Sequence, residues 1–330
     1  MLESLYINNF RCFSELTIKK LGLVNLIVGK NNSGKSSLLE AIMLNVAHEK
    51  QYLLSAFLKD RSGYALNEEL HFLKYSEVVV SPFYRRENRP LMNKEIIISQ
   101  NKDQLKEGLK IELDPVSRNI IITSNQNVSQ RFYEGDLLRN SSFDVSNAIF
   151  IRSNVDYNEL NAQLWGRIQL TNVEDAVTNH LKHIDDRIEK LAFELEGSTK
   201  RAMVKLRGVG KVPLKSLGEG TTKFLTIMLA MLATDVRYVF IDEIENGLHH
   251  SVQDKLWEIL FKIAELNHIQ LFVTTHSTDC VKSFEHALNQ QKDKSLGILM
   301  RLDNKNGVVK EVEYSADELE IATNNNIEVR

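Results

Sequence analysis

The most constraining feature of the chain is the string Gly-Lys-Asn-Asn-Ser-Gly-Lys-Ser at 29–36, which has the form G-x-x-x-x-G-K-S. The apolar run 23–28 precedes it and predicts a buried strand, and 37–43 begins a predicted helix. A strand, a Gly-rich loop and a helix in this order are the context in which the motif forms a phosphate-binding loop. Backbone N–H groups of such a loop, together with a helix N-terminus, attract anions. The sequence therefore predicts a nucleotide site.

Two acids extend this prediction. The apolar run 238–241 ends in Asp242 and Glu243. A buried strand that ends in carboxylates is costly unless they have cationic or metal partners. In the phosphate loop, Lys35 is predicted to reach the β- and γ-phosphates, and the Ser36 hydroxyl is predicted to ligate Mg²⁺. We expect Asp242 to complete the Mg²⁺ site and Glu243 to deprotonate a water that attacks the γ-phosphate.

A histidine follows a further predicted strand. The predicted strand 270–274 has the apolar centre Leu271-Phe272-Val273, and Thr275-His276-Ser277 comes directly after it. Ligands of open α/β sheets gather at the carboxyl ends of the strands, so His276 is predicted to face the γ-phosphate. A metal site built from His249, His250 and His276 is a weaker alternative.

A second glycine-bearing turn lies at 214–220, where Lys215-Ser216-Leu217-Gly218-Glu219-Gly220 opens a predicted helix. Such a turn is also suited to bind an anion. One nucleotide needs only one phosphate cradle of this kind. A second cradle, far from the first in sequence, suggests a site that two copies of the chain share.

With these motifs the chain resembles the ABC-type ATPases of the SMC, RecF and OLD kind, and most of all their compact bacterial relatives called AAA-family ATPases. The resemblance covers nearly the whole chain, beginning with Ile7-Asn8-Asn9-Phe10-Arg11. It implies ATP and Mg²⁺ as cofactors and a homodimer with the nucleotide sandwiched head to tail between two heads. The implied nucleotide-binding residues are Arg11, Gly29, Asn31, Asn32, Ser33, Gly34, Lys35, Ser36 and Ser37.

The same resemblance implies roles for the other motifs. Ser216, Gly218 and Gly220 would form the signature that contacts the γ-phosphate bound by the partner subunit. Glu243, His276 and Lys35 are the implied catalytic residues, and Ser36 and Asp242 the implied metal ligands. The segment 245–249 takes the place of the loop that links the two sites.

The chain departs from the pattern of these ATPases in three respects. The signature is not the transporter sequence Leu-Ser-Gly-Gly-Gln, which argues against a membrane-transporter subunit. The glutamine-loop residue is unassigned, and Arg152-Ser153-Asn154 lies where that loop is expected. The long coiled coil of SMC proteins and the C-terminal nuclease domain of OLD enzymes are both missing.

The predicted fold class is α/β: a P-loop NTPase with an ABC-ATPase-like head, a mixed sheet core, an antiparallel β lobe and a helical insertion. The β-rich runs 95–98, 109–113 and 119–123 predict the antiparallel lobe. The predicted domains are an N-terminal ATPase lobe at 1–150, a helical insertion with a basic hairpin at 151–215, and a C-terminal ATPase lobe at 216–330.

Two segments of the insertion leave alternatives open. A helix is predicted from 158 to 196, and its apolar residues from Val177 to Leu195 have heptad spacing. This helix is expected to pack on its own domain, with a short dimer contact as the alternative. The segment 200–215 holds six basic residues and no acid and predicts a hairpin around Gly208-Val209-Gly210. It is either a solvated hairpin or a patch for phosphate groups.

The composition narrows the class of protein. Hydrophobic residues make up 43% and charged residues 26% of 330 residues, as in ordinary globular proteins. No run approaches the ~18 apolar residues that span a bilayer, and Met1–Tyr6 lacks the pattern of a secretory signal. Two cysteines are too few for a disulfide framework. We therefore predict a cytoplasmic protein without a membrane partner, and the net charge of −3 gives no overall attraction to DNA.

Three functions follow as hypotheses. The first is a slow ATPase that acts as a dimeric switch on a separate effector, such as a nuclease or toxin, or on DNA, in anti-phage defence or genome maintenance. The second is a RecF-like ATPase that binds DNA directly in repair. The third is a nucleotide-dependent scaffold with negligible turnover, against which the intact Glu243 argues.

Overall fold

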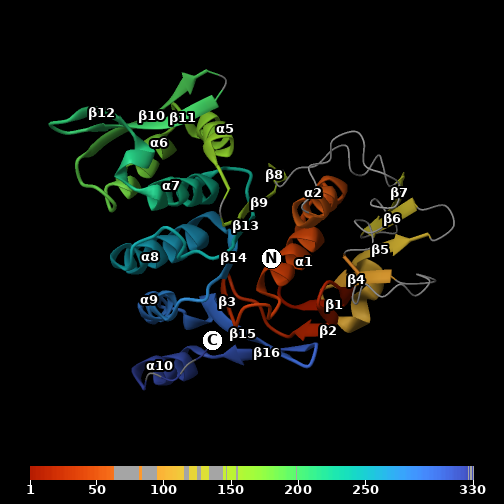
Figure 1. Cartoon of the computed structure of the whole chain (residues 1–330). Coiled ribbons are helices and arrows are strands. Elements are labelled where there is room, and N and C mark those ends of the chain that lie inside the picture. The colour runs from red at the N-terminus through yellow and green to blue at the C-terminus, as the bar shows by residue number, and fades with distance from the viewer. Residues whose placement is uncertain are drawn as a thin grey trace. The chain divides into compact units, whose positions relative to one another are not determined.

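The computed structural model describes residues 1–62, 82–83, 95–114, 119–124, 128–133, 144–145, 147–153, 155–197, 199–325, 327 and 329. The chain divides into two compact units, and Figure 1 labels their elements. Unit 1 comprises Met1–Gly22, Val28–Ala148 and Met300–Glu313, and unit 2 comprises Leu23–Ile27, Ile149–Leu299 and Tyr314–Arg330. The predicted boundaries at 150 and 215 stay predictions.

Unit 1 contains a six-stranded sheet in the order β2-β1-β4-β5-β6-β7, and every neighbouring pair is antiparallel. The strands are β1 (Leu5–Phe10), β2 (Phe13–Ile18), β4 (Glu95–Ser99), β5 (Leu109–Leu113), β6 (Asn119–Ser124) and β7 (Val128–Tyr133). The predicted antiparallel lobe is confirmed. The polar sequence of 124–130 predicts a loop, yet residues 128–130 belong to β7, because pairing with β6 supplies hydrogen bonds that a polar sequence does not reveal. The polar segment 100–107 also predicts a loop, and it holds a short 3₁₀ helix, η1 (Lys102–Glu107).

Helix α1 (Lys35–Val46) follows the phosphate loop, and α2 (Lys50–Ser62) follows α1. Residues Ser37 to Leu44 of α1 are all buried. Lys50 caps the C-terminus of α1, because its Nζ donates to the carbonyls of Leu44 (3.1 Å), Asn45 (2.8 Å) and Ala47 (2.6 Å). These carbonyls have no partner within the helix. The sequence also predicts core contacts at Leu70, Phe72 and Leu73, and these three lie outside the described residues.

Lys50 makes stability depend on pH. Burial lowers the pKa of Lys50 from 10.5 to about 8, so the folded chain binds fewer protons than the unfolded chain between these values. The free energy of unfolding should therefore rise as the pH rises from about 8 to 10.5. Lys50→Met should lose this pH dependence and about 1–3 kcal/mol of stability at neutral pH, because buried carbonyls lose their donor. Denaturant unfolding of both proteins across the interval measures this, and an unchanged slope in Lys50→Met would contradict it.

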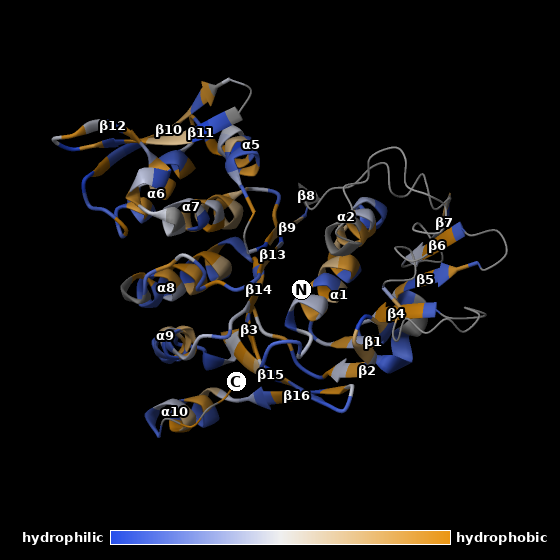
Figure 2. Cartoon of the chain, in the orientation of Figure 1, coloured by the Kyte–Doolittle hydropathy of each residue, from blue (hydrophilic) through white to orange (hydrophobic). Residues whose placement is uncertain are grey.

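The strands β3, β14 and β13 are parallel neighbours in a sheet that contains the order β15-β3-β14-β13-β9. Their bounds are β3 (Val24–Val28), β9 (Ala148–Ile151), β13 (Tyr238–Ile241), β14 (Gln270–Thr274) and β15 (Gly297–Lys305). Every residue of β3 and β14 is buried, as expected for parallel strands with both faces covered. Helices α7 (Glu219–Leu232), α8 (His250–Asn267) and α9 (Thr278–Asn289) lie along one side of these strands (Figure 1), and hydrophobic residues gather where they meet (Figure 2). The predicted parallel sheet is confirmed.

The same sheet continues with β16 (Val308–Tyr314) beside β15 and with β8 (Asp144–Val145) beside β9. A short 3₁₀ helix, η3 (Lys294–Leu296), precedes β15, and α10 (Ala316–Asn324) follows β16.

The predicted helix from 158 to 196 is wrong in its second half. The structure has α5 (Asn158–Ile168), α6 (Asn172–Leu181) and then a strand, β10 (Ile188–Glu196), which pairs with β11 (Thr199–Leu206) and, through it, β12 (Gly210–Pro213). The β10–β11 register shifts between Ile188 and Lys190. Such a bulge lets Ile188 and Leu191 both be buried, although residues three apart on a regular strand face opposite sides. The bulge therefore gives buried residues of a strand the spacing that is typical of a helix. Leu195, which also fits the heptad spacing, is 72% exposed. The predicted hairpin at 208–210 is confirmed.

Candidate nucleotide site

The phosphate loop connects β3 to α1 and has a backbone shape that requires glycine. Gly29 is buried with φ of 145°. A Cβ added to it would lie 2.6 Å from the carbonyl oxygen of Leu302 and 2.7 Å from Ser33 Oγ. The left-handed conformation and the close approach both exclude a side chain here.

Polar groups inside the loop fit phosphate oxygens. Lys35 Nζ donates to the carbonyls of Gly29 (2.7 Å) and Lys30 (3.1 Å), so the ammonium lies against the loop. The Ser33 hydroxyl is buried and has no hydrogen-bond partner among the described residues. A buried hydroxyl without a partner is costly, and phosphate oxygens would accept its hydrogen bond. Ser36 is half-buried in the first turn of α1, and Ser37 is buried.

Three other predicted nucleotide ligands lie around the loop. Arg11 has φ of 53°, and its Nε donates to Glu40 of α1 at 3.0 Å in a pair of nearly fully buried side chains. This pair braces α1, so the structure gives Arg11 a packing role and its contact with the nucleotide stays a prediction. Asn31 and Asn32 are exposed, and Asn304 Nδ2 donates to the carbonyl of Asn32 at 3.3 Å.

The two predicted acids are held at the carboxyl end of β13 by a threonine of the neighbouring strand. The Thr274 hydroxyl accepts the backbone N–H of Glu243 at 2.9 Å and donates to Asp242 Oδ1. Asn246 Nδ2 donates to Glu243 Oε2 at 2.6 Å. Glu243 itself has φ of 49°, a left-handed conformation that turns the chain sharply after the strand. Asp242 and Glu243 are both only partly buried, so their carboxylates remain accessible to ligands.

Oxygen donors of the predicted kind are present for Mg²⁺. The ion prefers carboxylate and hydroxyl oxygens together with substrate phosphates, and Asp242 and Ser36 supply both kinds. Ser36 lies in the first turn of α1, directly after the phosphate loop. The residues therefore fit Mg²⁺ in their chemistry.

An unpredicted carboxylate orients His276. Glu245 has a side chain 9% exposed and accepts hydrogen bonds from Thr275 Oγ1 (2.8 Å), His276 backbone N (2.9 Å) and His276 Nδ1 (2.9 Å). The three bonds fix the turn after β14 and the orientation of the imidazole. The sequence placed Glu245 only in a linking segment by resemblance, and no local pattern marks it as a partner of His276.

The alternative metal site receives no support. Among the residues searched in the described part of the chain, no group of three or more His, Cys, Asp or Glu could hold a metal ion. The side chain of His250 lies outside that part.

The predicted signature lies at the start of α7. Ser216 belongs to the short helix η2 (Leu214–Leu217), and Gly218 with φ of 118° precedes α7. Both residues are exposed. Gly220 is different, because a Cβ on it would lie 1.9 Å from the carbonyl oxygen of Gly247. Close packing on Gly247 explains the need for glycine at 220, and its predicted contact across a dimer stays a prediction.

A buried lysine joins the signature helix to the acidic turn. Lys223 of α7 is 9% exposed, and its Nζ donates to the backbone carbonyls of Glu243 (2.6 Å) and Asp242 (3.4 Å). Burial lowers the pKa of Lys223 to about 8, while the carboxylates of Glu245, Asp242 and Glu243 oppose this shift. Lys223 therefore links α7 to the backbone of the acidic turn.

The effect of Lys223→Met follows from this contact. The substitution keeps the length of the side chain but removes the donor, so we expect ATP turnover to fall about tenfold while nucleotide affinity changes little. In the wild type, turnover should fall as the pH rises through about 8, because Lys223 loses its proton there. This fall should be missing in Lys223→Met. Phosphate release and nucleotide titration across that pH interval measure both effects, and equal pH profiles would contradict the role.

Comparison with known proteins identifies the family and the fold of the chain. The family model described as "AAA domain, putative AbiEii toxin, Type IV TA system" matches residues 24–279. An "ATP/GTP phosphatase" of Helicobacter pylori is 24% identical over 333 residues, which cover 88% of this chain and 89% of that protein.

Two solved structures share the fold. An Smc head bound to the C-terminal winged-helix domain of ScpA has a TM-score of 0.58 and 12% identity, covering 97% of this chain and 99% of that chain. An Smc head with an extended coiled coil, bound to the C-terminal domain of ScpA from Pyrococcus furiosus, has a TM-score of 0.51 and 10% identity, with 99% of each chain covered. They confirm the predicted α/β fold of a P-loop NTPase with an ABC-type head.

Among the described residues, no helix combines the length and the apolar character needed to cross a membrane. The family model spans more than half of the chain. The protein therefore belongs to the family of AAA domains described as putative AbiEii toxins of type IV toxin–antitoxin systems.

Proposed function

We propose that this protein is an ATP-hydrolysing switch in which ATP joins two copies head to tail and hydrolysis separates them. The observation that carries the proposal is the exposed turn of Ser216 and Gly218 at the start of α7, in a chain that already has a phosphate loop. A helix N-terminus that ends in an exposed serine and glycine suits an anion. Because one nucleotide needs one such cradle, the second is available to the nucleotide of another copy.

In this proposal, the residues at the ends of β13 and β14 act together with the phosphate loop in hydrolysis. Lys35 would bind the β- and γ-phosphates, and bound Mg²⁺, held by Ser36 and Asp242, would neutralise phosphate charge. Glu243 would accept the proton of the attacking water with the carboxylate oxygen that Asn246 leaves available. His276, oriented by Glu245, would donate to the γ-phosphate.

The output of the switch is proposed to be a separate effector. The chain carries no nuclease motif that we identify, so a companion nuclease or toxin is the proposed partner, in anti-phage defence or genome maintenance. The family description, which names a toxin–antitoxin system, supports the defence role.

Direct DNA binding by the basic hairpin is less favoured. Three of its cations pair with acids of the adjacent part of the chain: Lys205 with Glu189 (2.8 Å), Arg207 with Asp186 (3.6 Å) and Lys211 with Glu194. The basic segment 200–215 contains no acid itself, because these acidic partners come from β10 and the turn before it. Such exposed pairs contribute little stability, but they offset the positive charge that DNA would need.

The dependence of turnover on protein concentration tests the proposal. A site assembled from two copies works only in the dimer, so ATP turnover per chain should rise with concentration over about two decades and then level off. The same measurement with GTP shows whether the nucleobase of the nucleotide affects turnover. Turnover per chain that is constant over the whole range would show that one copy suffices and would contradict the shared site.

A further inference from the structure

One buried residue at the end of β14 holds three consecutive residues of the acidic turn. Thr274 is fully buried. Its hydroxyl donates to Asp242 Oδ1 and accepts the backbone N–H of Glu243 at 2.9 Å. Its backbone carbonyl accepts the N–H of Ile244 at 3.1 Å. Thr274 therefore contacts the proposed metal ligand, the proposed general base and the residue that follows them.

The hydroxyl distinguishes the two oxygens of the Asp242 carboxylate. A threonine hydroxyl has one proton to donate, and Thr274 donates it to Oδ1. In the part of the chain that the structure describes, Oδ2 of Asp242 has no hydrogen-bond partner, and the residue is only partly buried. The bond to Oδ1 orients the carboxylate, so it decides where Oδ2 is presented to a cation.

The same hydroxyl supports the backbone conformation of Glu243. This residue has φ of 49°, which is uncommon for a residue with a side chain and persists where the surrounding contacts hold it. Its N–H donates to the Thr274 hydroxyl. Without that acceptor the N–H loses its partner, and the left-handed turn that places the Glu243 carboxylate loses a support.

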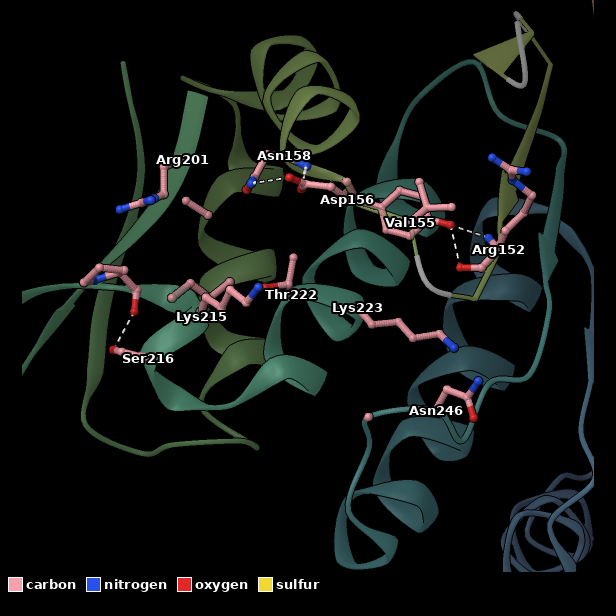
Figure 3. A pocket seen from close by; sticks show the side chains of 15 residues that line it. Arg152, Val155, Asp156, Asn158, Arg201, Lys215, Ser216, Thr222, Lys223 and Asn246 are labelled. Carbon is pink, nitrogen blue, oxygen red and sulfur yellow. Dashed lines mark hydrogen bonds between the residues drawn. The ribbon is translucent and has the colours of Figure 1, made fainter. Parts of the chain in front are cut away.

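Two other supports of the acidic turn lie on the wall of a cavity in unit 2, where Figure 3 shows Lys223 and Asn246. Lys223 donates to the backbone carbonyls of Asp242 and Glu243, and Asn246 donates to Glu243 Oε2. Burial lowers the pKa of Lys223 to about 8, so its bonds depend on pH. Of these three supports, Thr274 is the one that contacts the Asp242 carboxylate, and its hydroxyl does not titrate.

We propose that Thr274 is a positioning residue for hydrolysis, which aims Asp242 at the cation and holds Glu243 in the conformation that presents its carboxylate to water. This role rests on the proposed function, which assigns the metal to Asp242 and the proton transfer to Glu243. Thr274 acts through these two acids and contacts neither the nucleotide nor the attacking water. Loss of its hydroxyl should impair metal binding and turnover together, while the phosphate loop still binds the nucleotide.

The first experiment removes and restores the hydroxyl. Thr274→Val keeps the branched shape of the side chain, and Thr274→Ser keeps the hydroxyl. A residue that orients a metal ligand typically contributes a factor of about 10–100 in metal affinity or activity. The kcat of Thr274→Val should therefore fall by about tenfold to hundredfold with little change in KM for ATP, and Thr274→Ser should recover most of the loss.

Thr226→Val is the matched control for the first experiment. Thr226 is also fully buried, and its hydroxyl donates to the carbonyl of Thr222 within α7 at 2.9 Å. Its kcat should equal that of the wild type. A kcat of Thr274→Val equal to that of the control overturns the inference, and so does a loss in Thr274→Ser as large as the loss in Thr274→Val.

The second experiment measures the metal without turnover. Calorimetric titration with ADP in Mg²⁺ and in EDTA gives the factor by which Mg²⁺ strengthens nucleotide binding. This factor should be about tenfold or more smaller in Thr274→Val than in the wild type and Thr274→Ser. Affinity in EDTA should be the same in all three, because the phosphate loop is unchanged. An equal Mg²⁺ factor in Thr274→Val overturns the inference even where its turnover falls.

Amide hydrogen exchange measures the turn itself. In Thr274→Val the N–H of Glu243 should exchange about tenfold faster than in the wild type, because it has lost its acceptor. The N–H of Ile244 is the internal reference, since it donates to a backbone carbonyl that the substitution leaves in place. Equal exchange of Glu243 in both proteins overturns the inference.

These measurements distinguish the positioning role from the proposed function. If the wild type hydrolyses no ATP, the proposed function fails, and the Mg²⁺ factor and the exchange of Glu243 still decide whether Thr274 holds the two acids. If the wild type hydrolyses ATP and Thr274→Val does so equally well, the positioning role fails and the proposed function stands.

Discussion

Replacement of Glu243 by glutamine is expected to lower ATP turnover by about a hundredfold or more, because a positioned general base contributes a factor of about 10²–10⁴. Glutamine keeps the size of the side chain and an oxygen that can accept the hydrogen bond from Asn246. It cannot take the proton of the attacking water. Binding of ATP should remain, so the variant should accumulate in the ATP-bound state.

Phosphate release under saturating Mg²⁺-ATP measures the effect, with nucleotide titration beside it. Glu265→Gln is the matched control, because Glu265 is an exposed acid on α8 far along the sequence from the acidic turn. Its turnover should equal that of the wild type. Turnover of Glu243→Gln within about threefold of the wild type would exclude Glu243 as the general base.

Replacement of Lys35 by alanine is expected to weaken nucleotide binding by about tenfold to hundredfold, the value of a hydrogen bond to a charged group. In the structure its ammonium lies against the carbonyls of Gly29 and Lys30. Phosphate oxygens would be stronger acceptors for it than these neutral carbonyls. Loss of ATP binding should also abolish ATP-dependent pairing.

Calorimetric titration with ATP and with ADP measures the loss. The control is Lys20→Ala, since Lys20 is exposed and lies outside the loop. Both variants should unfold at the same denaturant concentration as the wild type. An affinity of Lys35→Ala equal to that of the control would show that the loop does not bind the phosphates through this residue.

Much of the fold was predictable because its core strands are continuous apolar runs with polar motifs at their ends. The runs before the phosphate loop, Asp242 and Thr275 became β3, β13 and β14, which are parallel neighbours. Because β13 and β14 are parallel neighbours, they end at the same edge of the sheet, and Asp242 and Thr275 lie at that edge. Chain order and hydrophobicity together contain this information.

The errors have a common physical origin in interactions with distant partners. The bulge between Ile188 and Lys190 gave a strand the spacing of a helix, and β7 takes its hydrogen bonds from β6 in spite of a polar sequence. The spacing of hydrophobic residues along one segment does not reveal which strand it will pair with.

The same limit applies to the site. Glu245 is defined by its bonds to His276, and Lys223 by its bonds to the carbonyls of the acidic turn. Both contacts join segments that are about 20 to 30 positions apart in sequence. Sequence motifs predicted the residues expected to meet the nucleotide, whereas the residues that hold them in place became visible only in the structure.

The mass of Glu243→Gln in solution shows whether ATP joins two copies. Analytical ultracentrifugation with Mg²⁺-ATP, with Mg²⁺-ADP and without nucleotide separates one copy from two. We expect two copies with ATP and a single copy with ADP or without nucleotide. The same mass in all three conditions would contradict a switch that ATP closes and hydrolysis opens.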